Sequence, residues 1–217
     1  MPFTYPRTSH VRRHGPRGYT GQHCHKKYAP WLRDEFAFRC VFCLVRERWF
    51  PGQGERGQNA FSVDHLMPKV DFPHLRCTYE NLVYSCRACN QAKSNRLGIA
   101  DPCIVAYADH VRVLDNGTIE PLSDEGRDLI DICLLDRPKL TAARARYLAL
   151  SRFLASLDQL DGLEAAEADK IRGDVFGYPE DLPDLSQEAP PEGNALPEGI
   201  PSSHHARHAR GELPGTY

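Results

Sequence analysis

Four cysteines in two close pairs are the residues of this chain whose type and spacing most clearly suggest chemistry. The pairs are Cys40-Val-Phe-Cys43 and Cys86-Arg-Ala-Cys89. Each C-x2-C turn offers two thiolates, and two such turns complete the tetrahedron of a structural Zn²⁺. Four thiolates leave no coordination position open, so this zinc would clamp the segments around it without taking part in catalysis. Four buried free cysteines are the alternative, but they leave the paired spacing unexplained.

An aspartate and a histidine stand side by side between the two cysteine pairs, at Asp64 and His65. Adjacent side chains of an extended strand point to opposite faces. One can therefore hold a metal ion while the other reaches a different side of the same substrate. Two asparagines follow: fifteen residues separate His65 from Asn81, and eight separate Asn81 from Asn90.

This pattern resembles the HNH endonucleases, whose ββα-metal motif carries an Asp-His or His-His pair, then an Asn, then a His or Asn. Asp64-His65, Asn81 and Asn90 match it, and the four cysteines match the zinc-binding subset of the family; together they cover about a third of the chain. Asn90 stands where many members have His. An amide oxygen is a weaker ligand than imidazole for soft metals, so we expect a hard catalytic ion, Mg²⁺ or Mn²⁺.

The resemblance implies a role for each motif residue. His65 is the expected general base, because a neutral imidazole with a pKa near ~6.5 can take a proton from the attacking water. Asp64 and Asn90 are the expected ligands of one divalent cation. Asn81 is expected to orient, through its amide, the segment that carries His65.

Each assignment has a purely structural alternative. Asn90 is also a favoured helix N-cap, and Asn81 is a common turn residue that bonds only local backbone. A histidine is usually an ordinary hydrogen-bonded side chain, but His65 occurs within the complete motif. Lys93 and Arg96, one helical turn beyond Asn90, are candidate nucleic-acid contacts and are equally suited to be surface charge.

Composition and charge indicate a small protein without a membrane span, whose basic and acidic residues are concentrated at opposite ends of the chain. The chain has 217 residues, 41% of them hydrophobic, enough for one domain with tails or two small domains. It contains no run of eighteen apolar residues and no apolar segment near its start, so we expect no membrane span, no signal peptide and a cytoplasmic location. The net charge of −2 is segregated: residues 1–30 hold six Lys and Arg and no acid, whereas residues 178–217 hold two Arg and seven acids.

A reducing cytoplasm favours metal ligands or thiols over disulfides. Four of the eight cysteines have no pair spacing among themselves and are expected to be free thiols: Cys24, Cys77, Cys103 and Cys133. Cys24 together with His23 or His25 forms an alternative second metal site.

The chain divides into four predicted segments. Residues 1–26 form a basic flexible arm, which either contacts phosphate or is only a solvated tail. Residues 27–100 form the nuclease core, residues 101–178 form a hairpin and helical extension packed on it, and residues 179–217 form a disordered acidic tail. The fold class is α+β, with a ββα-metal core stapled by the four-cysteine zinc site.

Within these segments, hydrophobic periodicity predicts helices at 27–38, 127–135 and 139–160, and a further helix over 90–96. Strands are expected at 41–49, 60–65, 103–107 and 110–114, with a loop at 51–59 and a hairpin turn at Asp115-Asn116-Gly117.

The most favoured function is a metal-dependent HNH endonuclease that hydrolyses phosphodiester bonds in DNA, double-stranded in the first instance. The alternative is a non-catalytic zinc module that binds nucleic acid. An RNase or a nickase is also open, since the motif acts on the phosphodiester itself. Bacterial restriction and phage-defence systems use such domains, which by analogy implies a protein partner.

Overall fold

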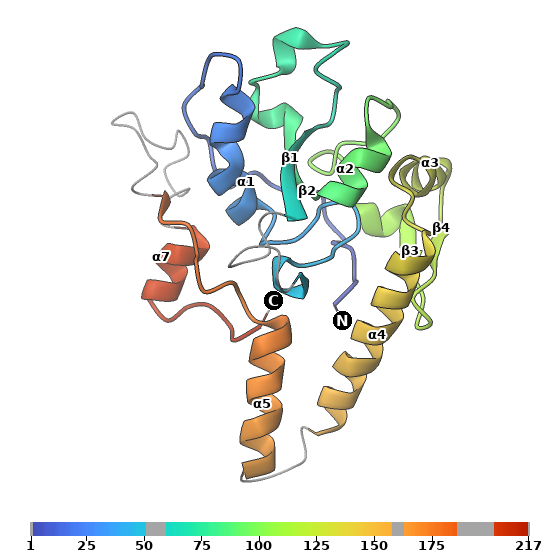
Figure 1. Cartoon of the computed structure of the whole chain (residues 1–217), viewed down its shortest axis with the longest axis vertical. Helices are drawn as coiled ribbons and strands as arrows, with labels where there is room; N and C mark the ends of the chain where they lie inside the picture. The colour runs from blue at the N-terminus through green and yellow to red at the C-terminus, as the bar shows by residue number, and fades with distance from the viewer. Residues whose placement is uncertain (1, 51–59, 158–162, 186–201, 217) are drawn as a thin grey trace.

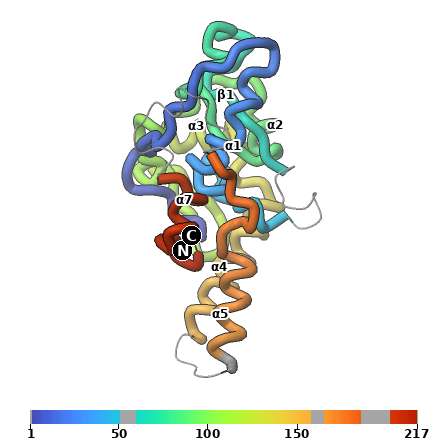
Figure 2. Tube along the Cα trace, turned by 90° about the vertical axis from the view of Figure 1, so that its left-hand side faces the viewer, coloured from blue at the N-terminus to red at the C-terminus, as the bar shows by residue number. Residues whose placement is uncertain are grey.

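A computed structural model describes residues 2–50, 60–157, 163–185 and 202–216. The predicted loop at 51–59 and residues 186–201 of the predicted tail lie outside this range. The described elements form a body of short helices and strands, from which two longer helices, α4 (Pro138–Ser156) and α5 (Leu163–Phe176), extend together (Figures 1 and 2). None of the described helices combines the length and the apolar composition that a membrane span requires.

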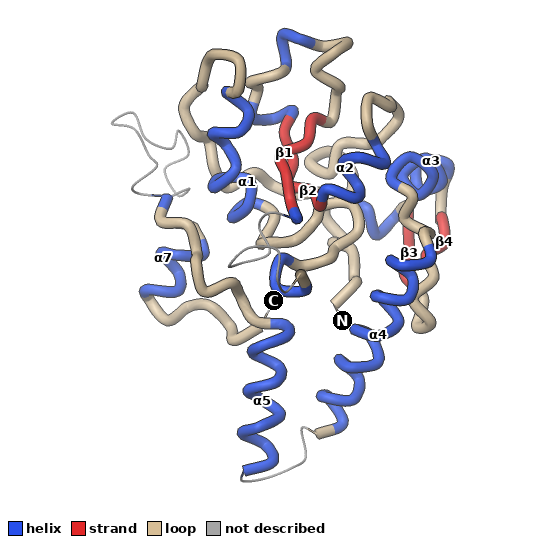
Figure 3. The backbone as a smooth tube through the Cα atoms, viewed as in Figure 1, coloured by secondary structure: helices blue, strands red, loops and turns tan. Residues whose placement is uncertain are grey.

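A two-stranded antiparallel sheet and the helix after it lie at the centre of the body (Figure 3). Strand β1 (Phe61–His65) pairs with β2 (Leu82–Cys86), so that Asp64 lies opposite Val83. Helix α2 (Arg87–Lys93) begins directly after β2 and contacts both strands. The predicted strand at 60–65 is therefore present. The helix predicted from residue 90 begins three residues earlier, because Cys86 is its N-cap.

The first cysteine pair lies in a turn, so the strand predicted at 41–49 is wrong. The backbone N–H of Leu44 donates to the Cys40 carbonyl, and the N–H of Cys40 donates to the Val45 carbonyl, both at 2.9 Å. Leu44 has the left-handed φ of 62° that such a reversal requires. Outside this turn only an isolated bridge, Arg39 to Arg46, and the 3₁₀ helix η2 (Glu47–Trp49) remain.

Helix α1 (Ala29–Glu35) follows the 3₁₀ helix η1 (Cys24–Tyr28) and lies within the helix predicted at 27–38. Pro30 stands at its first turn, where a missing N–H costs nothing, and Trp31 and Leu32 are fully buried. Between β1 and β2 the chain forms two 3₁₀ helices, η4 (Pro73–Leu75) and η5 (Tyr79–Asn81).

The second half of the chain contains a hairpin and helices. Strands β3 (Val111–Val113) and β4 (Ile119–Pro121) meet through the predicted turn, with Gly117 at a φ of 86°. Helix α3 (Asp124–Cys133) begins where the Ser123 hydroxyl accepts the N–H of Gly126 at 3.1 Å. Residues 103–107 form no strand, and the last of them, Tyr107, begins the 3₁₀ helix η6 (Tyr107–Asp109). Helix α4 ends at Ser156 and not near 160, and α5 was not predicted.

The N-terminal segment is packed against the body and is not a flexible arm. Phe3 and Tyr5 are 3% exposed and His14 is 1% exposed. The Tyr5 hydroxyl donates to the Phe42 carbonyl at 2.6 Å, inside the first cysteine turn. Arg12, one of the expected phosphate-binding cations, donates to the Leu82 carbonyl at 2.7 Å. Buried apolar residues, scattered among charged residues in the sequence, thus anchor a segment whose composition suggested mobility.

The described part of the C-terminal segment is also packed, which corrects the prediction of a disordered tail. Leu185 is fully buried, and Asp181 accepts from the Arg33 guanidinium at 2.7 Å. The short helix α7 (His204–Ala209) docks on α1, where the His204 N–H donates to Asp34 at 2.8 Å. The C-terminal segment is polar in composition, but buried ion pairs hold it on the body: Arg33 with Asp181, and His204 with Asp34.

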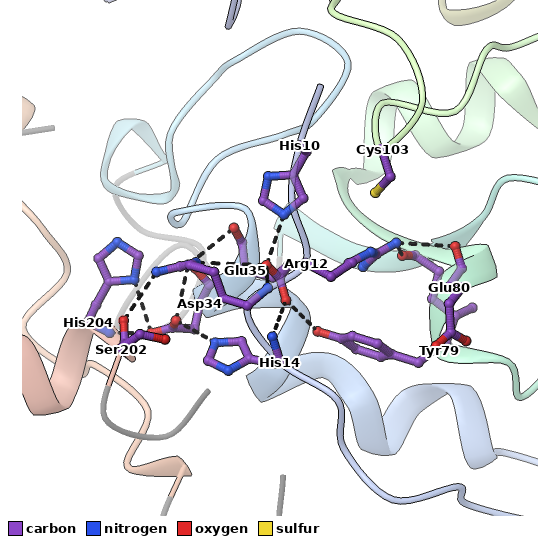
Figure 4. A network of polar contacts seen from close by, with 12 residues as sticks. His10, Arg12, His14, Asp34, Glu35, Tyr79, Glu80, Cys103, Ser202 and His204 are labelled. Atoms are coloured by element: carbon purple, nitrogen blue, oxygen red, sulfur yellow. Dashed lines mark hydrogen bonds and ion pairs between the residues drawn. The ribbon is translucent and has the colours of Figure 1, made fainter. Parts of the chain in front are cut away.

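Both ends of the chain meet at two adjacent acidic residues of α1, Asp34 and Glu35 (Figure 4). From the N-terminal segment, the His14 ring lies 2.8 Å from Asp34, and the His10 ring lies 2.9 Å from Glu35. From the C-terminal segment, His204 contacts Asp34. Both carboxylates are almost completely buried, so these contacts stabilise charges that would otherwise be costly to bury.

Candidate active site and metal centre

The four cysteines of the two pairs come together in space, as predicted. Their sulfur atoms all lie within 4.8 Å of one another, all four residues are buried, and the sulfurs of Cys43 and Cys86 are 3.7 Å apart. A tetrahedral ion with metal–sulfur bonds of ~2.3 Å places its sulfurs about 3.8 Å apart. Cys86 and Cys89 are three residues apart across the start of α2, so both face the first cysteine turn. The cluster is therefore positioned to bind a metal ion.

Arg137 lies beside this cluster, a contact that the sequence did not predict. Its Nη2 donates to the Cys89 sulfur at 3.5 Å, and its Nη1 donates to the carbonyls of Cys133 and Leu134 at 3.1 and 2.8 Å. Four thiolates around one divalent ion carry a net charge of about −2, which a guanidinium partly offsets. Arg137 thus joins the cysteine cluster to the end of α3.

His65 ends strand β1 with its ring held in one orientation. Its Nε2 lies 3.0 Å from the Arg76 carbonyl, which can only accept. Nε2 therefore carries the proton, and Nδ1 has the free lone pair. Burial lowers the pKa of His65 despite this hydrogen bond, and the residue is 7% exposed. At neutral pH the imidazole is uncharged and able to accept a proton at Nδ1.

Asp64 is buried on the other face of β1 with one oxygen unused. Oδ1 accepts the backbone N–H of His65 at 2.7 Å, whereas Oδ2 is buried and has no hydrogen-bond partner among the described residues. Burial raises the pKa of Asp64 to about 6, although the nearby Lys93 ammonium opposes this effect. A buried carboxylate oxygen without a donor fits the ligand set of a divalent cation.

Lys93 lies inside the site and not on the surface, which corrects its prediction as a nucleic-acid contact. The residue is fully buried, and its Nζ donates to the His65 carbonyl at 2.6 Å and lies 3.6 Å from Asp64 Oδ1. Lys93 follows Asn90 by three residues, so α2 presents both to the same strand. That spacing was the available sequence signal for this position.

Arg96 is exposed and bridges two helices through backbone carbonyls. Its guanidinium donates to the carbonyls of Ala92, Asp131 and Ile132, which joins the end of α2 to α3. Its expected contact with nucleic acid stays a prediction.

Asn81 clamps the loop that follows His65. Its Oδ1 accepts the Met67 N–H at 2.8 Å, and its Nδ2 donates to the carbonyls of Met67 and Leu75 at 3.0 and 3.3 Å. The Leu66 N–H donates to the Asn81 carbonyl at 2.9 Å. Asn81 therefore bonds Met67, fourteen positions earlier in the chain, beyond the local turn that its residue type alone would suggest.

Asn90 lies in the interior of α2 and is not its N-cap. Its Nδ2 donates to the Ser62 hydroxyl at 2.8 Å. Ser62 and Asp64 are two residues apart on β1 and therefore face the same side. The structure thus places Asn90 and Asp64 on the α2 side of the strand, with Lys93 as the cation beside Asp64.

Two other cysteines correct the sequence analysis. Cys24 and Cys77, expected as free thiols, are joined by a disulfide with their Cα atoms 5.6 Å apart. Cys103 and Cys133 are free, as expected. The pair lies 53 positions apart in sequence, so only the fold brings it together.

Comparison with known proteins identifies the class to which the central part of this site belongs. Residues 49–96 match the model of the HNH endonuclease family, so the chain contains an HNH endonuclease domain over this stretch. The Septu protein PtuB of Bacillus thuringiensis is similar over a longer region: 24% of 103 residues are identical, which cover 46% of this chain and 37% of that protein. The matched region thus spans well under two thirds of that relative.

Proposed function

We propose that this protein is a metal-dependent endonuclease that hydrolyses phosphodiester bonds in DNA. The observation that carries the proposal is the arrangement at the end of β1. There, a neutral histidine with a free Nδ1 is adjacent to a buried carboxylate with an unused oxygen. A module that only binds nucleic acid has no need of a proton acceptor beside such a carboxylate. The match of residues 49–96 to the HNH endonucleases supports the same reading.

In the proposed reaction, His65 Nδ1 takes a proton from a water molecule as its oxygen forms a bond to phosphorus. The bond from phosphorus to the 3′ oxygen breaks, and the leaving oxygen takes a proton from solvent water to become a hydroxyl. The imidazolium that results loses its proton to solvent. The Arg76 carbonyl holds the ring in the tautomer that this step needs. Asn81 fixes the loop after His65, so the base keeps its position through the reaction.

Asp64 Oδ2 and the Asn90 amide oxygen would hold one hard cation, Mg²⁺ or Mn²⁺. When bound, that ion would neutralise charge on the phosphate and stabilise the leaving oxygen. Lys93 keeps Asp64 ionised in its buried position and ties it to the backbone of His65. In the cysteine cluster a structural Zn²⁺ would join the turn before β1 to α2.

Nucleic acid is the substrate class that the surroundings of His65 favour. The side chains of Lys69, Lys93 and Arg76 all place positive charge near its ring. Lys69 is exposed and can approach a phosphate, unlike the buried Lys93. The similarity to a Septu protein supports a role in bacterial phage defence, with a protein partner that controls cleavage.

The decisive experiment measures plasmid cleavage by wild type, His65→Ala and Asp64→Ala with Mg²⁺ or Mn²⁺. General-base catalysis is worth ~10²–10⁴-fold, so His65→Ala should lose activity by that order while DNA binding and zinc content stay at wild-type levels. Raised Mn²⁺ should partly restore Asp64→Ala, because its defect is weak ion binding, but should not restore His65→Ala. Wild-type cleavage by His65→Ala would refute the nuclease mechanism and favour the non-catalytic binding module.

A further inference from the structure

His65 is contacted by two neighbouring segments. The ring of His25, in η1, lies 5.0 Å from the ring of His65 between centroids. On the other segment, the Arg76 carbonyl accepts from His65 Nε2 at 3.0 Å. A ring neighbour and a hydrogen bond together restrict both torsions of the His65 side chain.

The two segments are covalently joined next to these contacts. Cys24 immediately precedes His25, Cys77 immediately follows Arg76, and the disulfide links Cys24 to Cys77. Each end of the crosslink is thus one residue from a group that touches His65. Tyr28 adds a second connection, because its hydroxyl donates to the Cys77 carbonyl at 3.0 Å.

The surroundings of His25 indicate that its placement beside His65 matters more than any hydrogen bond that it makes. It is 7% exposed, and its Nδ1 is buried without a hydrogen-bond partner among the described residues. A histidine that served only the stability of the fold would normally have this nitrogen satisfied. Burying an unsatisfied nitrogen against the proposed base destabilises the folded protein. A placement of this kind indicates a functional role.

We propose that His25 and the Cys24–Cys77 disulfide are positioning residues that hold the ring of His65 for proton transfer. This inference rests on the proposed nuclease function and adds to it a second layer of groups around the base. A misplacement of about 1 Å at a reacting group can cost ~10²-fold in rate. Loosening either part of this support should therefore lower kcat and leave KM unchanged.

The crosslink is tested by reduction with a water-soluble phosphine. The phosphine gives two electrons to the S–S bond and becomes a phosphine oxide with the oxygen of water, and the two water protons end on the two sulfurs. Cys77 is half-buried, so the bond can be reached. Plasmid cleavage by the oxidised protein should fall on the order of 10-fold on reduction. Cys24→Ser/Cys77→Ser should behave like the reduced protein in either condition, with unchanged zinc content.

His25 is tested with a pair of variants. His25→Ala removes the ring and should lower kcat on the order of 10- to 100-fold without a change in KM. His25→Phe keeps a ring of similar shape and should restore most of kcat. Equal loss in both variants would mean that His25 acts through its nitrogens, and wild-type kcat in His25→Ala would mean that it does not act at all; either result overturns the proposal.

A spectroscopic measurement separates this proposal from the nuclease mechanism. Long-range ¹H–¹⁵N correlation spectra of the oxidised protein should show His65 as one tautomer, protonated at Nε2. Reduction or His25→Ala should produce averaged ring signals if the support is real, even if wild type cuts no DNA. Unchanged ring signals and unchanged cleavage in these samples would refute the positioning role while leaving the nuclease mechanism intact.

Discussion

At the scale of single residues, Lys93 shows how burial changes the meaning of a charge. A lysine near the end of a short helix suggests a surface cation, yet its ammonium is fully buried against the His65 carbonyl and the Asp64 carboxylate. Burying a cation is tolerable only beside such partners. The same contact that offsets its desolvation also connects α2 to both residues that we propose for catalysis.

Substitution of Lys93 should therefore affect stability more than DNA affinity. Lys93→Ala leaves Asp64 buried without its counter-charge, and breaking one partner of a buried pair typically costs about 3–5 kcal/mol. Lys69→Ala is the matched control, because Lys69 is exposed near the same site and should change the free energy of unfolding little. Urea denaturation of both variants measures the difference. Equal stability of the two variants would contradict the buried ion pair.

The types and spacing of the motif residues predicted much of the site. Asp64, His65 and the cysteines follow a pattern in which chemistry fixes both residue type and spacing. By contrast, Arg137 and His25 reach the site from segments outside the motif, and nothing in their local sequence indicates a contact with Cys89 or His65. Such residues are found only when the fold brings their side chains to Cys89 and His65.

At the scale of elements, the positions that the four cysteine sulfurs must take decide the local backbone conformation around each pair. Residues 41–49 alternate well enough to suggest a strand. The Val41 N–H does donate to the Tyr84 carbonyl in β2 at 3.0 Å, but the next backbone hydrogen bonds close the turn that presents Cys40 and Cys43. A turn that must place two thiolates at one point cannot remain extended. The same requirement moves the start of α2 forward to Arg87, so that Cys86 and Cys89 face the turn.

Removal of one pair should therefore unfold the central elements. Cys86→Ser/Cys89→Ser should lose the tightly held metal, about one zinc per chain in wild type, and with it the link from α2 to the first turn. Cys103→Ser is the control, since Cys103 lies outside the cluster. Metal analysis and thermal denaturation of both proteins provide the measurement. Full zinc content in the double variant would exclude the four-cysteine site.

Helical periodicity predicted α1, α3 and α4, but it did not indicate that an arginine of α4 is buried. Arg144, in the middle of α4, is fully buried, and its Nη1 donates to the Leu135 carbonyl at 2.7 Å. An arginine in a stripe that faces the core looks the same in sequence as one on the surface. Its partner is a backbone carbonyl at the end of another helix, which no pattern within α4 reveals.

At the scale of the whole molecule, the two ends of the described chain are organised by α1. Burial alone would raise the pKa of the Asp34 carboxyl, but hydrogen bonds from His14 and His204 outweigh it and hold the pKa well below its usual range. A carboxyl with a lowered folded pKa stabilises the protein above the unfolded pKa, near ~3.9. This stabilisation is lost as the pH falls through that value toward the folded pKa.

The free energy of unfolding should thus decline as the pH falls from about 4 toward 2. Asp34→Asn removes the titrating group and should be less stable than wild type at pH 7, with the difference shrinking in that acidic window. Denaturant unfolding at a series of pH values measures both curves, with Asp128→Asn on the exposed side of α3 as the control. A difference that stays constant down to pH 2 would show that folding does not lower the pKa of Asp34.

The two cysteine pairs bracket the motif, so the arrangement of the proposed catalytic residues should depend on the supply of the metal that the cluster binds. Asp64, His65 and Asn81 all lie in the stretch between the two cysteine pairs, whose sulfurs meet in the core. Thiolates favour soft ions, and copper(I) competes with zinc for such ligands. In a cell with too little zinc or an excess of copper, the protein would lose the arrangement of these residues even if magnesium were abundant. Trace-metal nutrition would thereby decide what share of the protein molecules is competent.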